Sequence, residues 1–295
     1  HTRCSRDWSS DVCSSDLGQP AFLVEKWHEA NRMVSEACER NGWHNICTLK
    51  EPYRLEGKKT MGLEIAEQLG WKMPAAIFYP MGGGLGALAI WKAFEELLQL
   101  GWIEGRLPRL YVTQFEGCAP VVAAFDEGRD ACTPWGKIGI PPGGLRSPNP
   151  PGGRAVLSLI RAHGGAAIGV STNEAFAAVD ELARQEGIFA CPESATTIAG
   201  LRKALDRGLV KADEQVVVVS TGSGAEALLE AVELPLATEE PAAAEAVPEL
   251  VEAIAPAEPE AASVLSAVQA AAEDFPLGEA DHIDDELFPI DRKST

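Results

Sequence analysis

The sequence predicts an α/β fold, in which the strands of one parallel sheet alternate with helices. Short apolar runs that suit buried strands recur along the chain, and stretches with apolar side chains at helical spacing follow them. A glycine-rich turn joins the first of these strands to its helix. The last run, Gln215 to Ser220, contains four successive valines, which suit a strand buried on both faces, as in parallel sheets.

Length, hydropathy and charge exclude two classes of protein. The 295 residues are enough for one large domain or two. No apolar run approaches the roughly 20 residues that cross a bilayer, so we expect no membrane segment. The net charge is −19, but residues 212–291 hold 20 acidic residues and no Lys or Arg, which leaves about +1 for the rest. Without a basic patch, we expect no nucleic-acid partner.

The seven cysteines are scattered and include no Cys-x-x-Cys pair and no His/Cys cluster with metal-site spacing. We therefore expect no metal, and reduced thiols of the kind found in cytoplasmic proteins. Cys118 lies beside a glycine, as some nucleophiles do. We expect it to pack in the core, because the sequence supplies no base for it.

The two ends resemble a translated sequencing adapter. Residues 7–17 read DWSSDVCSSDL and residues 291–295 read DRKST. We expect residues 1–17 and 291–295 to be adapter artefacts, and the reading frame to be truncated at its N-terminus. Residues 235–290 are rich in Ala, Glu and Pro, and we expect a disordered acidic tail because they bury too little apolar surface to fold.

The first elements are two helices, a strand and a further helix. Residues 21–41 and 61–69 have partly helical apolar spacing. The apolar run 75–79 predicts a buried strand, which Pro80 ends because proline has no N–H for a ladder. From 88 to 101 the apolar residues recur at the spacing of one helix face.

The next strand is expected at 109–115, and an apolar helix opens at 121–125. Residues 130–153 are rich in Pro and Gly and lack periodicity, which predicts a long irregular connection. A helix over 155–163 then leads to a short strand at 166–170.

The last predicted elements are two helices and the valine strand. Ser171 and Glu174 have the spacing of a capping box, which opens a helix that reaches Gln185. Residues 188–197 lead into a further helix, which ends at Gly208. We interpret Glu193 as a first-turn charge that faces the helix dipole, with an active-site carboxylate as the alternative.

The glycine-rich turn contains Gly82, Gly83, Gly84 and Gly86. Glycine permits positive φ and close backbone approach, so successive N–H groups can turn inward at the N-terminus of the following helix. A concavity of this kind suits a phosphate group. An ordinary connection remains the other interpretation, because a lone glycine motif is a weak signal.

Several motifs resemble threonine synthase, a pyridoxal-phosphate (PLP) enzyme of the tryptophan-synthase-β fold, fold type II. They are PYRLEGKKT at 52–60, EIAEQLGW at 64–71, PMGGG at 80–84, and QFEGCAP at 114–120. Residues 144–148, GLRSP, are similar to a degraded Gly-Ile-Arg-Val-Pro motif, and residues 192–196 are similar to Pro-Glu-Gly-Ala-Ala, with Ser194 as a departure. The resemblance runs from about Tyr53 to Gly224.

This resemblance implies a domain organisation and a reaction. Residues 53–234 are expected to be the C-terminal part of the PLP-binding α/β domain, and residues 18–52 the end of a smaller domain or a connection. The implied reaction converts O-phospho-L-homoserine and water to L-threonine and phosphate, with pyridoxal 5'-phosphate as cofactor. Protons leave Cα and Cβ, phosphate leaves Cγ, and water adds at Cβ.

The resemblance also implies the cofactor contacts. The backbone of Gly82, Gly83, Gly84, Leu85 and Gly86 is expected to hold the cofactor phosphate, and the Thr221 hydroxyl to contact the ring nitrogen. A hydroxyl at that place need not keep the nitrogen protonated. The expected partner is a small-molecule substrate. A homodimer is expected as well, although the sequence itself leaves the oligomeric state open.

The Schiff-base lysine of the family lies in a Ser-Phe-Lys-Asp-Arg type motif, and no such motif occurs in this sequence. Lys50, Lys58 and Lys59 do not match it. We therefore assign no catalytic residue and expect the chain as written to be inactive and unable to hold the cofactor covalently.

Three alternatives stay open at this point. One is another fold type II enzyme, such as a threonine or serine dehydratase, since its phosphate loop is also glycine-rich. Another is an NAD-dependent dehydrogenase, because Gly82-x-Gly84-x-x-Ala87 formally fits the dinucleotide pattern. The acid expected about 20 residues on is lacking, which argues against it. The third is a fragment without activity of its own.

Overall fold

The computed structural model describes residues 27–140 and 143–225. The predictions for the adapter-like ends and the acidic tail lie outside these residues. The described helices are α1 (Trp27–Asn41), α2 (Tyr53–Lys58), α3 (Thr60–Gln68), α4 (Leu85–Gln99), the 3₁₀ turn η1 (Glu116–Cys118), α5 (Pro120–Asp126), α6 (Gly153–His163), α7 (Thr172–Glu186) and α8 (Pro192–Asp206). The described strands are β1 (Ala76–Pro80), β2 (Arg109–Phe115), β3 (Ala166–Val170) and β4 (Val216–Val218).

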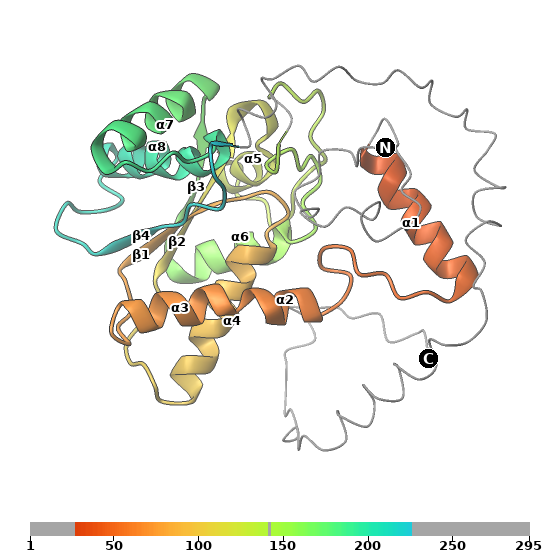
Figure 1. Ribbon diagram of the computed structural model, residues 1–295, viewed down its shortest axis with the longest axis horizontal. Coiled ribbons are helices and arrows are strands. Elements are labelled where there is room, and N and C mark those ends of the chain that lie inside the picture. Colours follow the sequence, from red (N-terminus) through yellow and green to blue (C-terminus); the bar gives the residue numbers. More distant parts are fainter. Residues whose placement is uncertain (1–26, 141–142, 226–295) are drawn as a thin grey trace. The chain divides into compact units, whose positions relative to one another are not determined.

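The four strands form one parallel sheet in the order β3-β2-β1-β4 (Figure 1). Strands β1, β2 and β3 follow one another across the sheet, whereas β4 lies on the other side of β1. The strand order therefore reverses between β1 and β4. In open α/β sheets, ligands bind in the crevice at the carboxyl ends of the strands at such a reversal.

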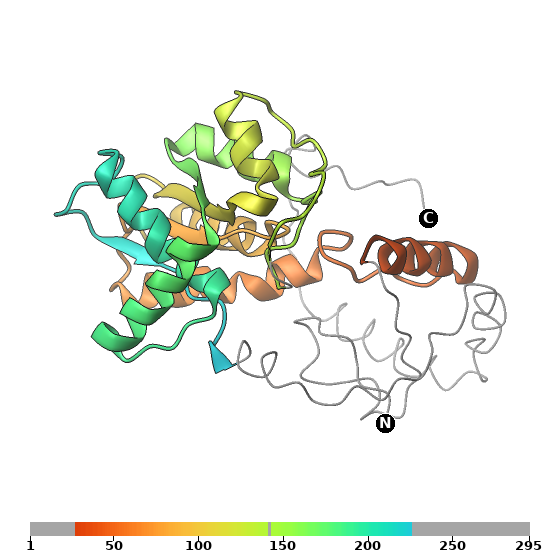
Figure 2. The ribbon, with the colours of Figure 1, turned by 90° about the horizontal axis from the view of Figure 1, so that it is seen from above.

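Helices α7 and α8 cover one face of the sheet, and α5 and α6 lie on the opposite side (Figure 2). Phe78 of β1 and its register partner Tyr111 of β2 both point to the α8 side, where their rings stack with centroids 4.7 Å apart. Small side chains of α7 and α8, such as Ala178 and Ala195, pack in the same cluster. This buried apolar layer anchors α8 against the sheet.

Helix α4 carries the next packing layer. It is buried along most of its length, and α2 and α3 pack against it. Gly62 of α3 permits this close approach, since an added Cβ there would lie 2.7 Å from the Cβ of Ala93. Gly62 therefore allows α3 to pack directly against α4.

The structure confirms most of the predicted elements and adds two short ones, α2 and η1. The spans of β2 and β3 match the predicted ranges, and Ser171 and Glu174 form the expected capping box. Helix α2 was not expected from the charged run at 53–60. It is capped by the buried carboxylate of Glu51, which accepts hydrogen bonds from the N–H groups of Tyr53 at 2.5 Å and Arg54 at 3.0 Å.

The prediction for the valine strand was wrong in one respect. Strand β4 contains only Val216–Val218, and its side chains are half-buried. It is therefore not buried on both faces, and it lies at the edge of the described sheet, where it pairs with β1 alone. In the described part of the chain, no helix combines the length and the apolar character that a membrane crossing requires.

Candidate functional site

The glycine loop leaves the sheet at the carboxyl end of β1. The Met81 N–H donates to the carbonyl of Thr113 at 2.9 Å, which extends the pairing of β1 and β2 by one bond. Gly84 then has a φ of 95°, in the left-handed region, and is the N-cap residue of α4. A glycine is favoured there because other residues are strained at positive φ.

The backbone of this loop presents donors without protein acceptors. Leu88 makes the first bond of α4, to the carbonyl of Gly84 at 3.1 Å. Among the described residues, no acceptor is found for the N–H groups of residues 82–87. The Gly83 carbonyl instead accepts from the Gly152 N–H at 2.9 Å. Because a trans peptide holds its C=O and N–H in opposite directions, the Gly84 N–H points away from Gly152.

Side chains would not fit at two further loop positions. An added Cβ at Gly82 would lie 2.5 Å from the carbonyl oxygen of Gly144, and one at Gly86 would overlap the hydroxyl of Tyr79. These close contacts, with the free N–H groups at a helix N-terminus, fit the phosphate of the expected cofactor.

Tyr79 lies at the same helix end and was not singled out in the sequence. Its side chain is only 7% exposed, and no hydrogen bond of its hydroxyl is found among the described residues. Burial raises the pKa of Tyr79 to about 12, so the phenol stays protonated in neutral solution. A protonated phenol beside Gly86 is a potential donor to an anion.

Strand β4 brings the Thr221 turn to the same edge of the sheet. The Val219 N–H donates to the carbonyl of Phe78 at 3.0 Å, so the chain beyond β4 stays paired with β1. Thr221 follows two residues later and is exposed. The glycine loop and Thr221 thus leave the carboxyl ends of two neighbouring parallel strands, at the reversal of strand order.

A buried hydroxyl on α8 holds this turn. Ser194 is 2% exposed, and its Oγ accepts hydrogen bonds from the N–H groups of Thr221 at 2.8 Å and Gly222 at 3.0 Å. On the other side of the turn, the carbonyl of Gly222 accepts from the Cys191 N–H at 3.1 Å. The sequence marked Ser194 only as a departure from a motif, because nothing local indicates a contact with residue 221.

The segment that begins at Gly143 links the two parts of the site. The carbonyl of Gly144 lies against Gly82, and the carboxylate of Glu193 lies against Gly143. Glu193 is in the first turn of α8, as expected, one residue before Ser194. Its carboxylate therefore borders the region between the glycine loop and the Thr221 turn, which keeps both interpretations of Glu193 compatible with its position.

Lys59, in the PYRLEGKKT motif, is held by two carboxylates. Lys59 Nζ lies 2.6 Å from a carboxylate oxygen of Glu56 and 2.6 Å from one of Glu96. Partial burial lowers the pKa of Lys59, but the hydrogen bonds to both carboxylates outweigh it and raise the pKa. A lysine held protonated in this way is unsuited to Schiff-base chemistry, which needs the neutral amine.

Cys118 packs in the core, as the sequence predicts. Cys118 is fully buried, and burial raises the pKa of its thiol, which disfavours the thiolate that a nucleophile needs. Within the described residues, no group of three or more His, Cys, Asp or Glu side chains is arranged to hold a metal ion.

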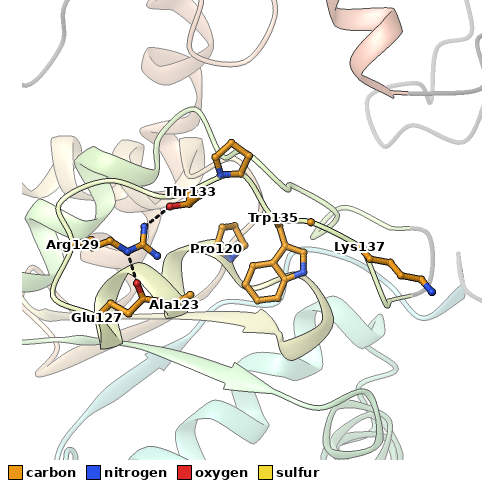
Figure 3. Close-up of a pocket in the computed structure, with 9 residues that line it drawn as sticks. Pro120, Ala123, Glu127, Arg129, Thr133, Trp135 and Lys137 are labelled. Atoms are coloured by element: carbon orange, nitrogen blue, oxygen red, sulfur yellow. Dashed lines mark hydrogen bonds and ion pairs between the residues drawn. The ribbon is translucent and has the colours of Figure 1, made fainter.

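A surface hollow of about 720 Å³ lies beside α5 and the loop that follows it (Figure 3). One of its two cations, Arg129, donates to the Glu127 carboxylate at 2.6 Å and to the Thr133 hydroxyl at 2.8 Å. Trp135 donates its indole N–H to the carbonyl of Gly117 at 2.9 Å. These contacts stabilise the loop that follows α5.

Comparison with known proteins gives one family. The family described as "Pyridoxal-phosphate dependent enzyme" matches residues 13–222. A threonine synthase of Methanosarcina acetivorans is 40% identical over 194 residues, which are 66% of this chain and 47% of that protein. A threonine synthase of Methanocaldococcus jannaschii is 38% identical over 173 residues, 59% of this chain and 42% of that protein. The chain thus spans less than half the length of these curated relatives.

Solved structures share the fold. The processed form of threonine deaminase isoform 2 from Solanum lycopersicum has a TM-score of 0.58 at 19% identity, over 75% of this chain and 62% of that one. Maize serine racemase has a TM-score of 0.51 at 16% identity, over 67% of this chain and 59% of that one. At these identities, the likeness concerns the fold alone.

Proposed function

This chain belongs to the pyridoxal-phosphate dependent enzyme family, and from that premise we propose that it is the part of a threonine synthase that holds the phosphate and the ring of the cofactor. The proposed reaction of the whole enzyme converts O-phospho-L-homoserine and water to L-threonine and phosphate. Pyridoxal phosphate supplies an electron sink that makes the protons next to the amino-bearing carbon easier to remove.

One observation carries this proposal. The glycine loop after β1 and the Thr221 turn after β4 lie at the carboxyl ends of adjacent strands, where the strand order reverses. A small molecule with an anionic group at one end and a ring nitrogen at the other matches these two features.

We assign the phosphate contacts to the backbone of Gly82, Gly83, Gly84, Leu85 and Gly86. Their N–H groups are free of protein acceptors among the described residues and lie at the positive end of the α4 dipole. The exposed Thr221 hydroxyl is assigned to the ring nitrogen. No lysine of this chain is assigned to the Schiff base, and the carboxylates around Lys59 support that choice.

The relatives favour threonine synthase over a dehydratase. Identities of 38–40% to threonine synthases exceed the 16–19% of the deaminase and racemase structures. The family match also removes the dehydrogenase alternative. A cytoplasmic location, which the scattered cysteines support, and a homodimer, which light scattering tests, complete the proposal.

Two experiments test it. In the first, the full chain is titrated with pyridoxal phosphate, and binding is followed by quenching of tryptophan fluorescence and by the ³¹P resonance. We expect saturable binding without a stoichiometric lysine adduct after borohydride reduction. Failure to bind, or a single reduced lysine together with threonine formation, contradicts the assignments above.

In the second, residues 53–224 replace the matching part of the M. acetivorans threonine synthase, and the chimera is assayed on O-phosphohomoserine and on threonine. Formation of threonine from the first supports the proposal. A chimera that binds the cofactor and only deaminates threonine supports the dehydratase alternative.

A further inference from the structure

The Ser194 hydroxyl is the centre of the hydrogen bonds that hold the Thr221 turn. Its oxygen accepts the N–H groups of Thr221 and Gly222, at 2.8 and 3.0 Å. It also lies 3.1 Å from the sulfur of Cys191 and 3.4 Å from the hydroxyl oxygen of Thr221. The side chain is 2% exposed, so water contributes little to this network.

The number of bonds that a hydroxyl can make decides which group donates. A serine oxygen has two lone pairs and one hydrogen. The N–H groups of Thr221 and Gly222 occupy both lone pairs, so the Ser194 oxygen has no lone pair left for a third donor. Its own hydrogen is then donated to Cys191 Sγ or to Thr221 Oγ1. In either case, the Thr221 hydroxyl cannot donate to Ser194.

The Thr221 hydrogen must therefore find its acceptor elsewhere. Thr221 is exposed at the edge of the sheet where the glycine loop also lies. The geometry points to Ser194 as a positioning residue. Ser194 fixes the turn through two backbone hydrogen bonds and leaves the Thr221 hydroxyl as a donor to the unprotonated ring nitrogen of the cofactor. This inference rests on the proposed cofactor site.

The contacts of Cys191 support the same role. Its N–H donates to the carbonyl of Gly222 at 3.1 Å, and its sulfur accepts the N–H of Ser194 at 3.4 Å. The first turn of α8 therefore binds both the N–H and the C=O side of residue 222. A turn held from both sides keeps one orientation of its hydroxyl, as a precise ring contact requires.

The variant that tests this role is Ser194→Ala in the full chain. Thr197→Val is the matched control, because Thr197 is equally buried on α8 but its hydroxyl donates to the Ser194 carbonyl at 2.6 Å. We expect Ser194→Ala to speed hydrogen–deuterium exchange of the peptide 219–224 by about tenfold, since two backbone donors lose their acceptor. The control should leave that peptide at the wild-type rate.

Two NMR signals of the bound cofactor distinguish an effect on its ring nitrogen from an effect on its phosphate. With pyridoxal phosphate labelled with ¹⁵N in the ring, the wild-type chain should show a nitrogen shift typical of an accepted hydrogen bond. In Ser194→Ala this shift should move toward that of a pyridine nitrogen without a hydrogen-bond donor, and the dissociation constant should rise about tenfold. The ³¹P resonance of the bound cofactor should stay unchanged. A general loss of structure would move both resonances.

Unchanged exchange of the peptide 219–224 in Ser194→Ala overturns the inference, and so does an unchanged ¹⁵N shift in a variant that binds the cofactor. If wild-type chain binds no cofactor, the proposed function fails, and hydrogen exchange alone decides whether Ser194 holds the turn. If Ser194→Ala does not fold, Ser194→Gly takes its place. It removes the same hydroxyl and has the glycine of the similar Pro-Glu-Gly-Ala-Ala motif, so we expect the same changes.

Discussion

The N–H of Val219 donates to the carbonyl of Phe78 at 3.0 Å, and this bond extends the pairing of β4 with β1 to the point where the Thr221 turn and the glycine loop begin. The pairing begins at Ala76 opposite Val216 and continues to Phe78 opposite Val218. Two loops that the sequence places far apart thereby leave the sheet side by side. The proposed cofactor site depends on the glycine loop and the Thr221 turn lying next to each other.

The first prediction concerns the phosphate loop. Gly84→Ala introduces a side chain at a φ of 95° and brings its Cβ to 3.2 Å from atoms of Met81 and Val156. Gly101→Ala has comparable backbone strain at a φ of 69°, but nothing lies within 4 Å. Both variants should lose roughly 1–2 kcal/mol in urea unfolding. Only Gly84→Ala should weaken pyridoxal phosphate binding, by about tenfold or more. If Gly84→Ala binds pyridoxal phosphate with wild-type affinity, the glycine loop is not part of the cofactor site.

The second prediction concerns the contact between Gly86 and Tyr79. An added Cβ at Gly86 overlaps the Tyr79 hydroxyl and ring, so Gly86→Ala should lower the free energy of unfolding by about 1–3 kcal/mol. Tyr79→Leu in the same chain should restore part of this loss. In α2, Gly57→Ala meets nothing within 4 Å and should instead stabilise the protein by about 0.4–1 kcal/mol. Additive effects of the Gly86 and Tyr79 changes would show that the contact is absent in solution.

The third prediction concerns the ion pairs of Glu96 on α4 with Lys59 and Lys92. Partial burial raises the pKa of Glu96, but the hydrogen bonds from Lys59 and Lys92 outweigh it and hold the pKa below the ordinary value. The stabilisation is therefore present at neutral pH and is lost as the pH falls through the folded-state pKa. Glu96→Gln should cost about 0.5–1 kcal/mol at pH 7 and nothing measurable at strongly acid pH. An equal cost at both pH values would contradict the ionic origin.

The fourth prediction concerns alkaline stability. The pKa of Tyr79 is about 12 in the folded protein, above the value of about 10 for an unperturbed phenol. Stability that depends on the neutral phenol is present below pH 10 and is lost as the pH rises toward 12. Tyr79→Phe should therefore show a smaller loss of stability between pH 9 and 12 than wild type. Tyr53→Phe, at an exposed ring, is the control. Parallel curves for wild type and Tyr79→Phe would refute the burial of this hydroxyl.

Much of the fold was predictable because its signals are local. The apolar runs of β2 and β3, the capping box at Ser171 and the left-handed glycine at Gly187 each act through neighbouring residues. The glycine loop was visible for the same reason, since its residue types limit the backbone at that place.

The remaining features depend on contacts between distant segments. Helix α2 forms in a charged run because Glu51 caps it, which its composition does not show. The position of β4 at the sheet edge follows from the strand order, and the role of Ser194 follows from the turn that packs against it. The residue pattern of one segment does not show which distant segment it will contact.

The pairing of β4 with β1 also sets the order of events when the chain folds from denaturant. Neighbours β1 and β2 are linked by a single helix, whereas β4 reaches β1 only after all the intervening elements, and such long-range pairing forms slowly. During refolding, helical circular dichroism should therefore recover before the ability to capture pyridoxal phosphate. The recovery of cofactor binding would therefore mark the time at which β4 pairs with β1.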